Sequence, residues 1–160
     1  MLLIKLLILS SLAMISYQDI KERQVYAFVF LVLIGLLGYI HHQHTLQIHF
    51  LYALLINTTV LIIIMAMLYL YTLLRLKRSF FEEVFGLGDV LFFLALAVGF
   101  PTVSFIIILV FALLFSLAIW IFFKKSAKYP TVPLAGYMSL FLGVVFVTNW
   151  TTNVISLYLI

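Results

Sequence analysis

The sequence predicts an all-α membrane protein, a polytopic bundle of six transmembrane helices that forms one membrane-embedded domain over residues 1–160. Hydrophobic residues make up 67% of the chain and charged residues 9%, whereas soluble globular domains average about 45–50% and about 25%. The mean hydropathy is +1.32. This composition excludes soluble enzymes, nucleic-acid-binding proteins and disordered chains. The alternation typical of membrane β-strands is absent, so each apolar stretch is predicted to be a helix.

Six apolar stretches are the candidate spans. They cover residues 2–17, 25–40, 50–74, 90–100, 103–123 and 132–150. A helix needs about 20 residues to cross the hydrocarbon core, so the third, fifth and sixth stretches are long enough by themselves. The first and second need flanking residues. The fourth is too short alone, and must either include residues 80–89 as helix or begin below the membrane surface.

The basic residues predict the orientation of these spans. Eight of the nine lysines and arginines fall in the first, third and fifth connections, and Lys5 is the exception. The positive-inside rule makes that side cytoplasmic and puts both termini outside. An alternative is that residues 1–16 are a short secretory signal, whose removal would leave five spans. The eight residues are Lys21, Arg23, Arg75, Lys77, Arg78, Lys124, Lys125 and Lys128.

The carboxylates gather on the same side as these basic residues. Asp19 follows the first span and Asp89 precedes the fourth, so packing these two spans together would join the two carboxyls at one depth. Neighbouring carboxyls in a partly desolvated setting share a proton. One then acts as general base on water while the other donates a proton to a scissile carbonyl. The alternative is that each aspartate merely charges or caps a helix end.

The segment Gly86-Leu87-Gly88-Asp89 favours the catalytic interpretation. Glycines before the acid remove side-chain bulk and permit unusual backbone angles, which would let a substrate strand or a partner helix approach Asp89. The alternative is a helix-initiating loop with Asp89 as N-cap. The chain has no cysteine, and neither a metal nor a cofactor is expected. The four histidines at 41, 42, 44 and 49 are predicted to lie in an exposed interfacial loop.

Three segments resemble the type IV prepilin peptidases, membrane aspartyl proteases with six spans and a Gly-x-Gly-Asp site. They are residues 19–25, 86–90 and 132–137, and the last contains Pro133. The resemblance implies that Asp19 and Asp89 are catalytic and that Gly86, Gly88 and Pro133 support the site. The chain lacks the cysteine-containing cytoplasmic insertion of many bacterial members and so resembles the minimal form.

Two positions depart from the usual family pattern. Family members usually have Ile-Pro-Asn or Ile-Pro-Asp after the first aspartate, where this chain has Val25-Tyr26-Ala27. The lysine that often follows two residues after the second aspartate is Leu91 here. Without the proline, the start of the second span is expected to be less rigid.

The resemblance also implies a substrate: a prepilin or pilin-like precursor cut at the cytoplasmic face of the cell membrane, after a glycine between a basic leader and an apolar helix. Glu22, Glu82 and Glu83 are candidates for binding the leader, or they balance nearby basic residues. The expected partners are this precursor and the lipid bilayer, with no nucleic acid. The alternative is a small proton-coupled carrier or a non-catalytic assembly factor for pili or secretion. Carriers keep ionisable groups near the midplane, which disfavours this alternative.

Overall fold

The structure, a computed structural model, describes residues 2–76, 86–124, 131–152 and 157–158. Within these residues every regular element is a helix. The elements are α1 (Leu2–Glu22), α2 (Ala27–His44), α3 (Gln47–Tyr71), the short π-helix η1 (Thr72–Leu76), α4 (Leu87–Gly99), α5 (Thr102–Phe123) and α6 (Leu134–Thr152). Five of the helices are long and apolar enough to cross a membrane, and α4 is a shorter apolar helix. The all-α prediction is therefore confirmed.

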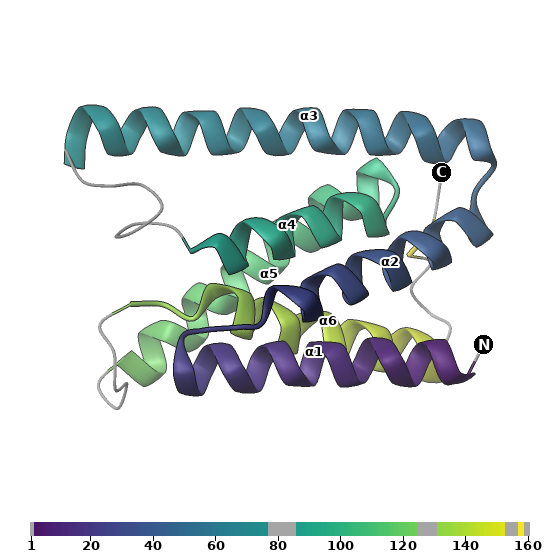
Figure 1. Cartoon of the computed structure of the whole chain (residues 1–160), viewed down its shortest axis with the longest axis horizontal. Helices are drawn as coiled ribbons and strands as arrows, with labels where there is room; N and C mark the ends of the chain where they lie inside the picture. Colours follow the sequence, from purple (N-terminus) through teal and green to yellow (C-terminus); the bar gives the residue numbers. More distant parts are fainter. Residues whose placement is uncertain (1, 77–85, 125–130, 153–156, 159–160) are drawn as a thin grey trace.

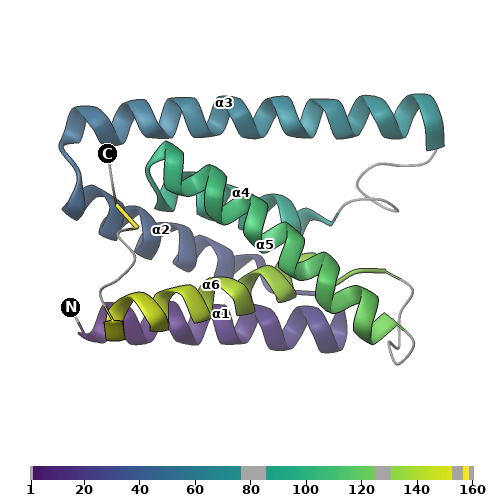
Figure 2. The same cartoon turned by 180° about the vertical axis from the view of Figure 1, so that it is seen from behind.

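The helices run back and forth, so their ends form two groups (Figures 1 and 2). One group contains the end of α1, the starts of α2, α4 and α6, and the ends of α3 and α5. The opposite group contains the two short turns from α2 to α3 and from α4 to α5. Asp19 and Asp89 both belong to the first group, because they lie in the last turns of α1 and the first turn of α4.

Several helix boundaries differ from those predicted. Helix α1 continues to Glu22, so Asp19 lies inside the helix and not in the loop after it. Helix α2 continues to His44, and His41 is buried instead of exposed in a loop. In both cases one face of the additional turns is packed against neighbouring helices. Because this packing stabilises the helix, it extends beyond the point where the sequence changes from hydrophobic to polar residues.

Helices α2 and α4 form the central packing contact, and glycines allow their close approach. A Cβ at Gly99 would lie 2.9 Å from Leu37 Cβ, and a Cβ at Gly38 would lie 2.9 Å from Val98 Cγ1. Small residues at a helix interface let the backbones come close, which is the main source of packing energy between helices in lipid. Nearer the other end of this pair, Phe30 is fully buried beneath Gly88.

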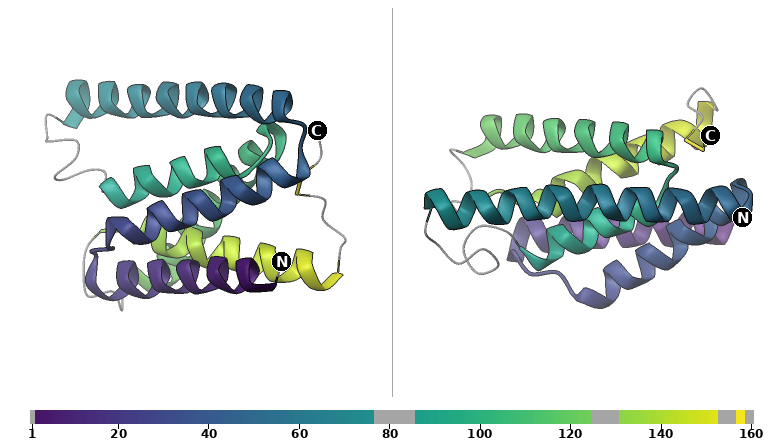
Figure 3. Two further views of the ribbon diagram at one scale, coloured as in Figure 1. Left: turned by 45° about the vertical axis from the view of Figure 1, so that its right-hand side comes forward. Right: turned by 90° about the horizontal axis from the view of Figure 1, so that it is seen from above.

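Helix α3 packs mainly through its first half. Its buried residues are Ala53, Asn57 and Leu61, and Figure 3 shows α4 diverging from it beyond this region. The Asn57 amide nitrogen donates to the carbonyl oxygens of Ala97 and Phe100, both at 2.8 Å. Asn57 therefore satisfies carbonyls at the C-terminal end of α4, which no further helical turn can satisfy. The polar side chain in this apolar span is a cap for a neighbouring helix.

We expect Asn57→Leu to lower the free energy of unfolding by about 2 kcal/mol, since two buried carbonyls lose a donor while the branched shape of the side chain is kept. Thermal unfolding in detergent measures the effect. Thr59→Val is the matched control, because the Thr59 hydroxyl is exposed and bonds only to Leu55 O of its own helix. Equal melting temperatures for the two variants would show that Asn57 does not hold α4.

Candidate active site

Asp19 lies in the last turns of α1, half-buried against the start of α6. Its Oδ2 atom accepts a hydrogen bond of 2.6 Å from the backbone amide of Gly136. The contact joins residues that are 117 positions apart in the sequence. It is supported by the packing of α1 along α6, which is one of the most extensive helix contacts in the molecule.

Asp89 reaches the same helix from α4. Its Oδ1 atom accepts a hydrogen bond of 2.8 Å from the backbone amide of Ala135. Helix α4 is capped by the backbone of Gly86, without a side-chain cap, and the Asp89 amide donates to Gly86 O at 3.0 Å. The alternative that Asp89 is the N-cap of its own helix is therefore wrong. Its carboxyl is directed to a different helix.

The two aspartates are thus brought together by α6. Consecutive amide nitrogens are separated by three covalent bonds, about 4 Å at most, so both bonded carboxyl oxygens lie at the same turn of α6. The carboxyls of Asp19 and Asp89 interact electrostatically there. Direct packing of the first span against the fourth was the route by which the sequence could join the two carboxyls. Instead α1 packs chiefly on α6 and α2, and α4 packs chiefly on α2 and α3.

The start of α6 is suited to hold negative charge. Its first amides have no partner within the helix, and the helix dipole places partial positive charge at this end. Pro133 is buried just before the first helical residue, Leu134, where a proline costs no helical hydrogen bond. The proposed support residue Pro133 therefore lies at the site, next to the two amides. Sequence reasoning missed the amides of Ala135 and Gly136 themselves, because a backbone donor leaves no side-chain signal.

The glycines near the site act through their lack of bulk. A Cβ at Gly136 would lie 3.0 Å from Asp19 Oδ2 and 3.1 Å from Asp19 Cβ, and a Cβ at Gly86 would lie 3.3 Å from Asp89 Oδ2. A Cβ at Gly88 would make ordinary contact with Phe30, at 3.4 Å. None of the described glycines has a positive φ. The expectation of unusual backbone angles at Gly86 and Gly88 is therefore wrong, and close approach is what these positions provide.

The departure from the family pattern at Tyr26 has a structural counterpart. Tyr26 has φ −62° and ψ 122°, which are angles that a proline also adopts. Its backbone amide donates to the buried side chain of Gln18 at 3.3 Å, a bond that a proline cannot make. The hydrogen bond from Tyr26 to Gln18 thus restrains the backbone at the start of α2, where family members usually have a proline.

The remaining predicted site residues lie apart from this pair or outside the structure. Glu22 is exposed at the end of α1, while Glu82 and Glu83 lie outside the described residues. His41 bonds through Nδ1 to Val98 O at 2.9 Å, at the opposite end of the bundle. In the part of the chain that the structure describes, no three His, Asp or Glu side chains form a group suited to a metal.

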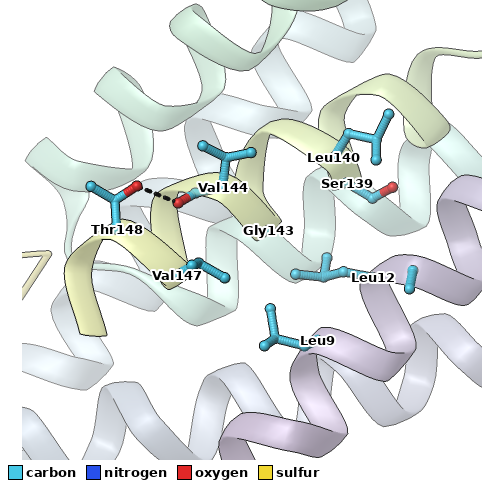
Figure 4. Close-up of a pocket in the computed structure, with 9 residues that line it drawn as sticks. Leu9, Leu12, Ser139, Leu140, Gly143, Val144, Val147 and Thr148 are labelled. Carbon is cyan, nitrogen blue, oxygen red and sulfur yellow. Dashed lines mark hydrogen bonds between the residues drawn. The ribbon is translucent and has the colours of Figure 1, made fainter. Parts of the chain in front are cut away.

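A groove runs along α1 and α6 from a point near the two aspartates. It has a volume of about 430 Å³ and is shown in Figure 4. Its lining is apolar except for Ser139 and Thr148, whose hydroxyls bond to carbonyls of their own helix. Ser139 lies three residues after Gly136, about 4.5 Å along the helix axis. The lining residues are Leu9, Leu12, Ala13, Ser139, Leu140, Gly143, Val144, Val147 and Thr148.

Comparison with known proteins identifies the family. The model of the type IV leader peptidase family matches residues 6–122, which include both aspartates and the Gly86–Asp89 segment. The chain belongs to the type IV leader peptidase family. No curated protein and no solved structure matches it. Membership in this family, together with five helices able to span a membrane, makes the chain a membrane peptidase that acts on a protein substrate.

We expect Gly136→Ala to lower leader peptidase activity at least about tenfold, because the added methyl group displaces the Asp19 carboxyl, and misplacement by about 1 Å can cost about 100-fold. The rate of precursor cleavage in detergent is the measurement. Gly35→Ala is the matched control, since a Cβ at Gly35 meets nothing within 4 Å. Wild-type activity in Gly136→Ala would show that the tight contact with Asp19 is not needed.

Proposed function

We propose that this protein is an aspartic endopeptidase that removes the basic leader from prepilin-like precursors, with Asp19 and Asp89 as the catalytic pair. The observation that carries the proposal is the pair of hydrogen bonds from adjacent amides, Ala135 to Asp89 and Gly136 to Asp19. These bonds attach two half-buried carboxyls to the same turn of α6. A carboxyl pair at close range is the minimal apparatus for water-dependent peptide hydrolysis without a covalent intermediate.

In the proposed mechanism the pair holds one proton between the two carboxyls, since like charges this close do not both ionise cheaply. The ionised carboxylate takes a proton from water, and the hydroxide attacks the scissile carbonyl carbon. The protonated carboxyl gives its proton to the carbonyl oxygen. The tetrahedral diol then breaks its C–N bond as the leaving amine takes a proton from the first carboxyl and one diol hydroxyl returns a proton to the second, which restores the singly protonated pair and leaves a carboxylic acid product.

We further propose that α1 to α6 are the six spans of a single domain over residues 1–160, with both termini outside. The charges support this orientation. Lys21, Arg23 and Lys124 lie at the bundle end that carries Asp19 and Asp89, and a cytoplasmic side is rich in such residues. Lys5, the exception, lies over the ring of Trp150 at 5.0 Å, at the other end of α1. Cleavage would then occur at the cytoplasmic face of the cell membrane, and the exposed carboxylate of Glu22 would be available to the basic leader.

The groove between α1 and α6 supports an apolar helix as the second part of the substrate. It begins about one turn from Gly136 and continues away from the aspartates along α6. A helix lying in it would present its first residues to the catalytic pair. Gly143 lies in the groove wall, and a Cβ added there would meet nothing within 4 Å. Small residues with open space beside them allow another helix to pack closely in lipid.

We expect Asp19→Asn and Asp89→Asn each to lower precursor cleavage by at least about 100-fold, because an amide neither takes nor gives the catalytic proton. Each variant should still insert into the membrane, since an asparagine oxygen can accept the same amide hydrogen bond. Cleavage is followed by the mass of the product, and insertion by membrane fractionation. Near wild-type cleavage by either variant would refute the catalytic pair and favour the carrier or assembly alternative.

We expect Gly143→Leu to lower kcat/KM for a membrane-anchored precursor about tenfold, as an added side chain overfills a packing position. Cleavage of a soluble peptide that contains the leader and the scissile glycine, but no apolar helix, should change less than twofold. Gly35→Leu is the control, since a Cβ at Gly35 also meets nothing within 4 Å and Gly35 is not in the groove. Equal rates for the two leucine variants on the anchored precursor would exclude the groove as the binding place of the helix.

A further inference from the structure

Arg23 has an unusual backbone at the end of α1. Among the described residues other than glycine, it is the one with a positive φ, 58°. Its amide donates to Asp19 O at 3.2 Å and closes the last turn of the helix. Positive φ is unfavourable for a residue with a Cβ, and a residue keeps this conformation only where the surrounding structure enforces it. At the end of α1, Arg23 therefore adopts a backbone conformation that glycine would adopt more easily, and this conformation sets the direction of its side chain.

The Arg23 side chain joins three segments that are distant in the sequence. An Nη atom donates to the carbonyl oxygen of Thr131, just ahead of α6. The guanidinium lies over the ring of Trp120 near the end of α5, at 6.0 Å from the ring centre. Planar guanidinium groups combine stacking with fixed hydrogen bonds, which a lysine ammonium does not. Arg23 thus connects the end of α1 to α5 and to the segment that leads into α6.

This connection acts on the two aspartates by position and by charge. Thr131 precedes Pro133 by two residues and Ala135 by four, so a bond at Thr131 fixes the segment whose amides hold the carboxyls. The charge of Arg23 also interacts with both Asp19 and Asp89. A half-buried cation is screened less than exposed ones. The other charged side chains described at this end, Lys21, Glu22 and Lys124, are all exposed.

We propose that Arg23 is a positioning residue for the catalytic pair: it holds the start of α6 against Asp19 and Asp89 and places a positive charge near the two carboxyls. This inference rests on the proposed function and assigns to Arg23 a role in the chemical step instead of in substrate binding. Its loss should therefore affect kcat more than KM.

The test uses the full-length protein in lipid vesicles and compares Arg23→Gln, Arg23→Lys and Arg23→Gly with wild type over a range of pH. Lys21→Gln is the matched control, because Lys21 is a cation two residues away whose Nζ bonds to the Tyr17 hydroxyl of its own helix. Arg23→Gly removes the guanidinium but suits the positive φ, so any loss of activity in it does not come from backbone strain.

We expect Arg23→Gln and Arg23→Gly to lower kcat about tenfold, the usual effect of losing a charge-assisted hydrogen bond, with KM changed less than twofold. Without a positive charge nearby, carboxyls ionise at higher pH, so both limbs of the pH–rate profile should move to higher pH. Arg23→Lys should restore the wild-type profile and part of kcat. Lys21→Gln should resemble wild type throughout.

Three results would overturn the inference. Wild-type kcat in both Arg23→Gln and Arg23→Gly would show that the residue is dispensable. An unshifted pH–rate profile in both Arg23→Gln and Arg23→Gly, with a lowered melting temperature, would show a structural role only. Absence of cleavage by the wild-type protein would refute the proposed function and this inference with it, whereas the first two results would leave the proposed function intact.

Discussion

The whole arrangement depends on the first turn of α6, where two adjacent amides face two carboxyls. Asp19 and Asp89 come from helices that are not each other's main packing partners, and the hydrogen bonds to Gly136 and Ala135 are what unite them. A helix start supplies free amides and partial positive charge without a further side chain. The helix start therefore stabilises the two carboxyls in an apolar bundle, where a cation besides Arg23 would be costly to bury.

The amides and Arg23 also balance the charges of the pair. Two carboxylates near a membrane surface repel each other and resist loss of water, so each needs donors in compensation. The α6 amides give one donor to each carboxyl, and Arg23 supplies the nearest half-buried positive charge. The backbone of Gly86 is a further donor to Asp89. The site is therefore partly neutralised by backbone amides, and among these contributions only that of Arg23 comes from a basic side chain. Under the proposed function, a substrate carbonyl would meet two acids whose orientation is fixed in advance.

The features that follow from local patterns, such as helices and acidic residues at their ends, could be predicted from the sequence. The features that depend on contacts between distant segments could not. The apolar runs predicted six helices, and two acids beside span ends predicted Asp19 and Asp89 as a pair. The continuation of α1 through Asp19, the burial of His41 and the donor role of Gly136 arise from contacts between distant segments. None of these has a signal within a short window. Pro133 marked the start of the sixth helix in the sequence, but it did not indicate which side chains the first amides of that helix would bind.

The depth of Asp89 follows from a cap at the other end of its helix. Helix α4 has 13 residues, about 20 Å of helix, and this is less than the thickness of the hydrocarbon core. A helix that stops inside an apolar bundle leaves carbonyls without partners, which is costly in lipid. Asn57 of α3 donates to two of them, at Ala97 and Phe100, so α4 can stop there. With its far end fixed, the short helix places Asp89 in its first turn, where the carboxyl meets the first turn of α6. An asparagine at one end of the bundle thus helps to set the position of the acid at the other.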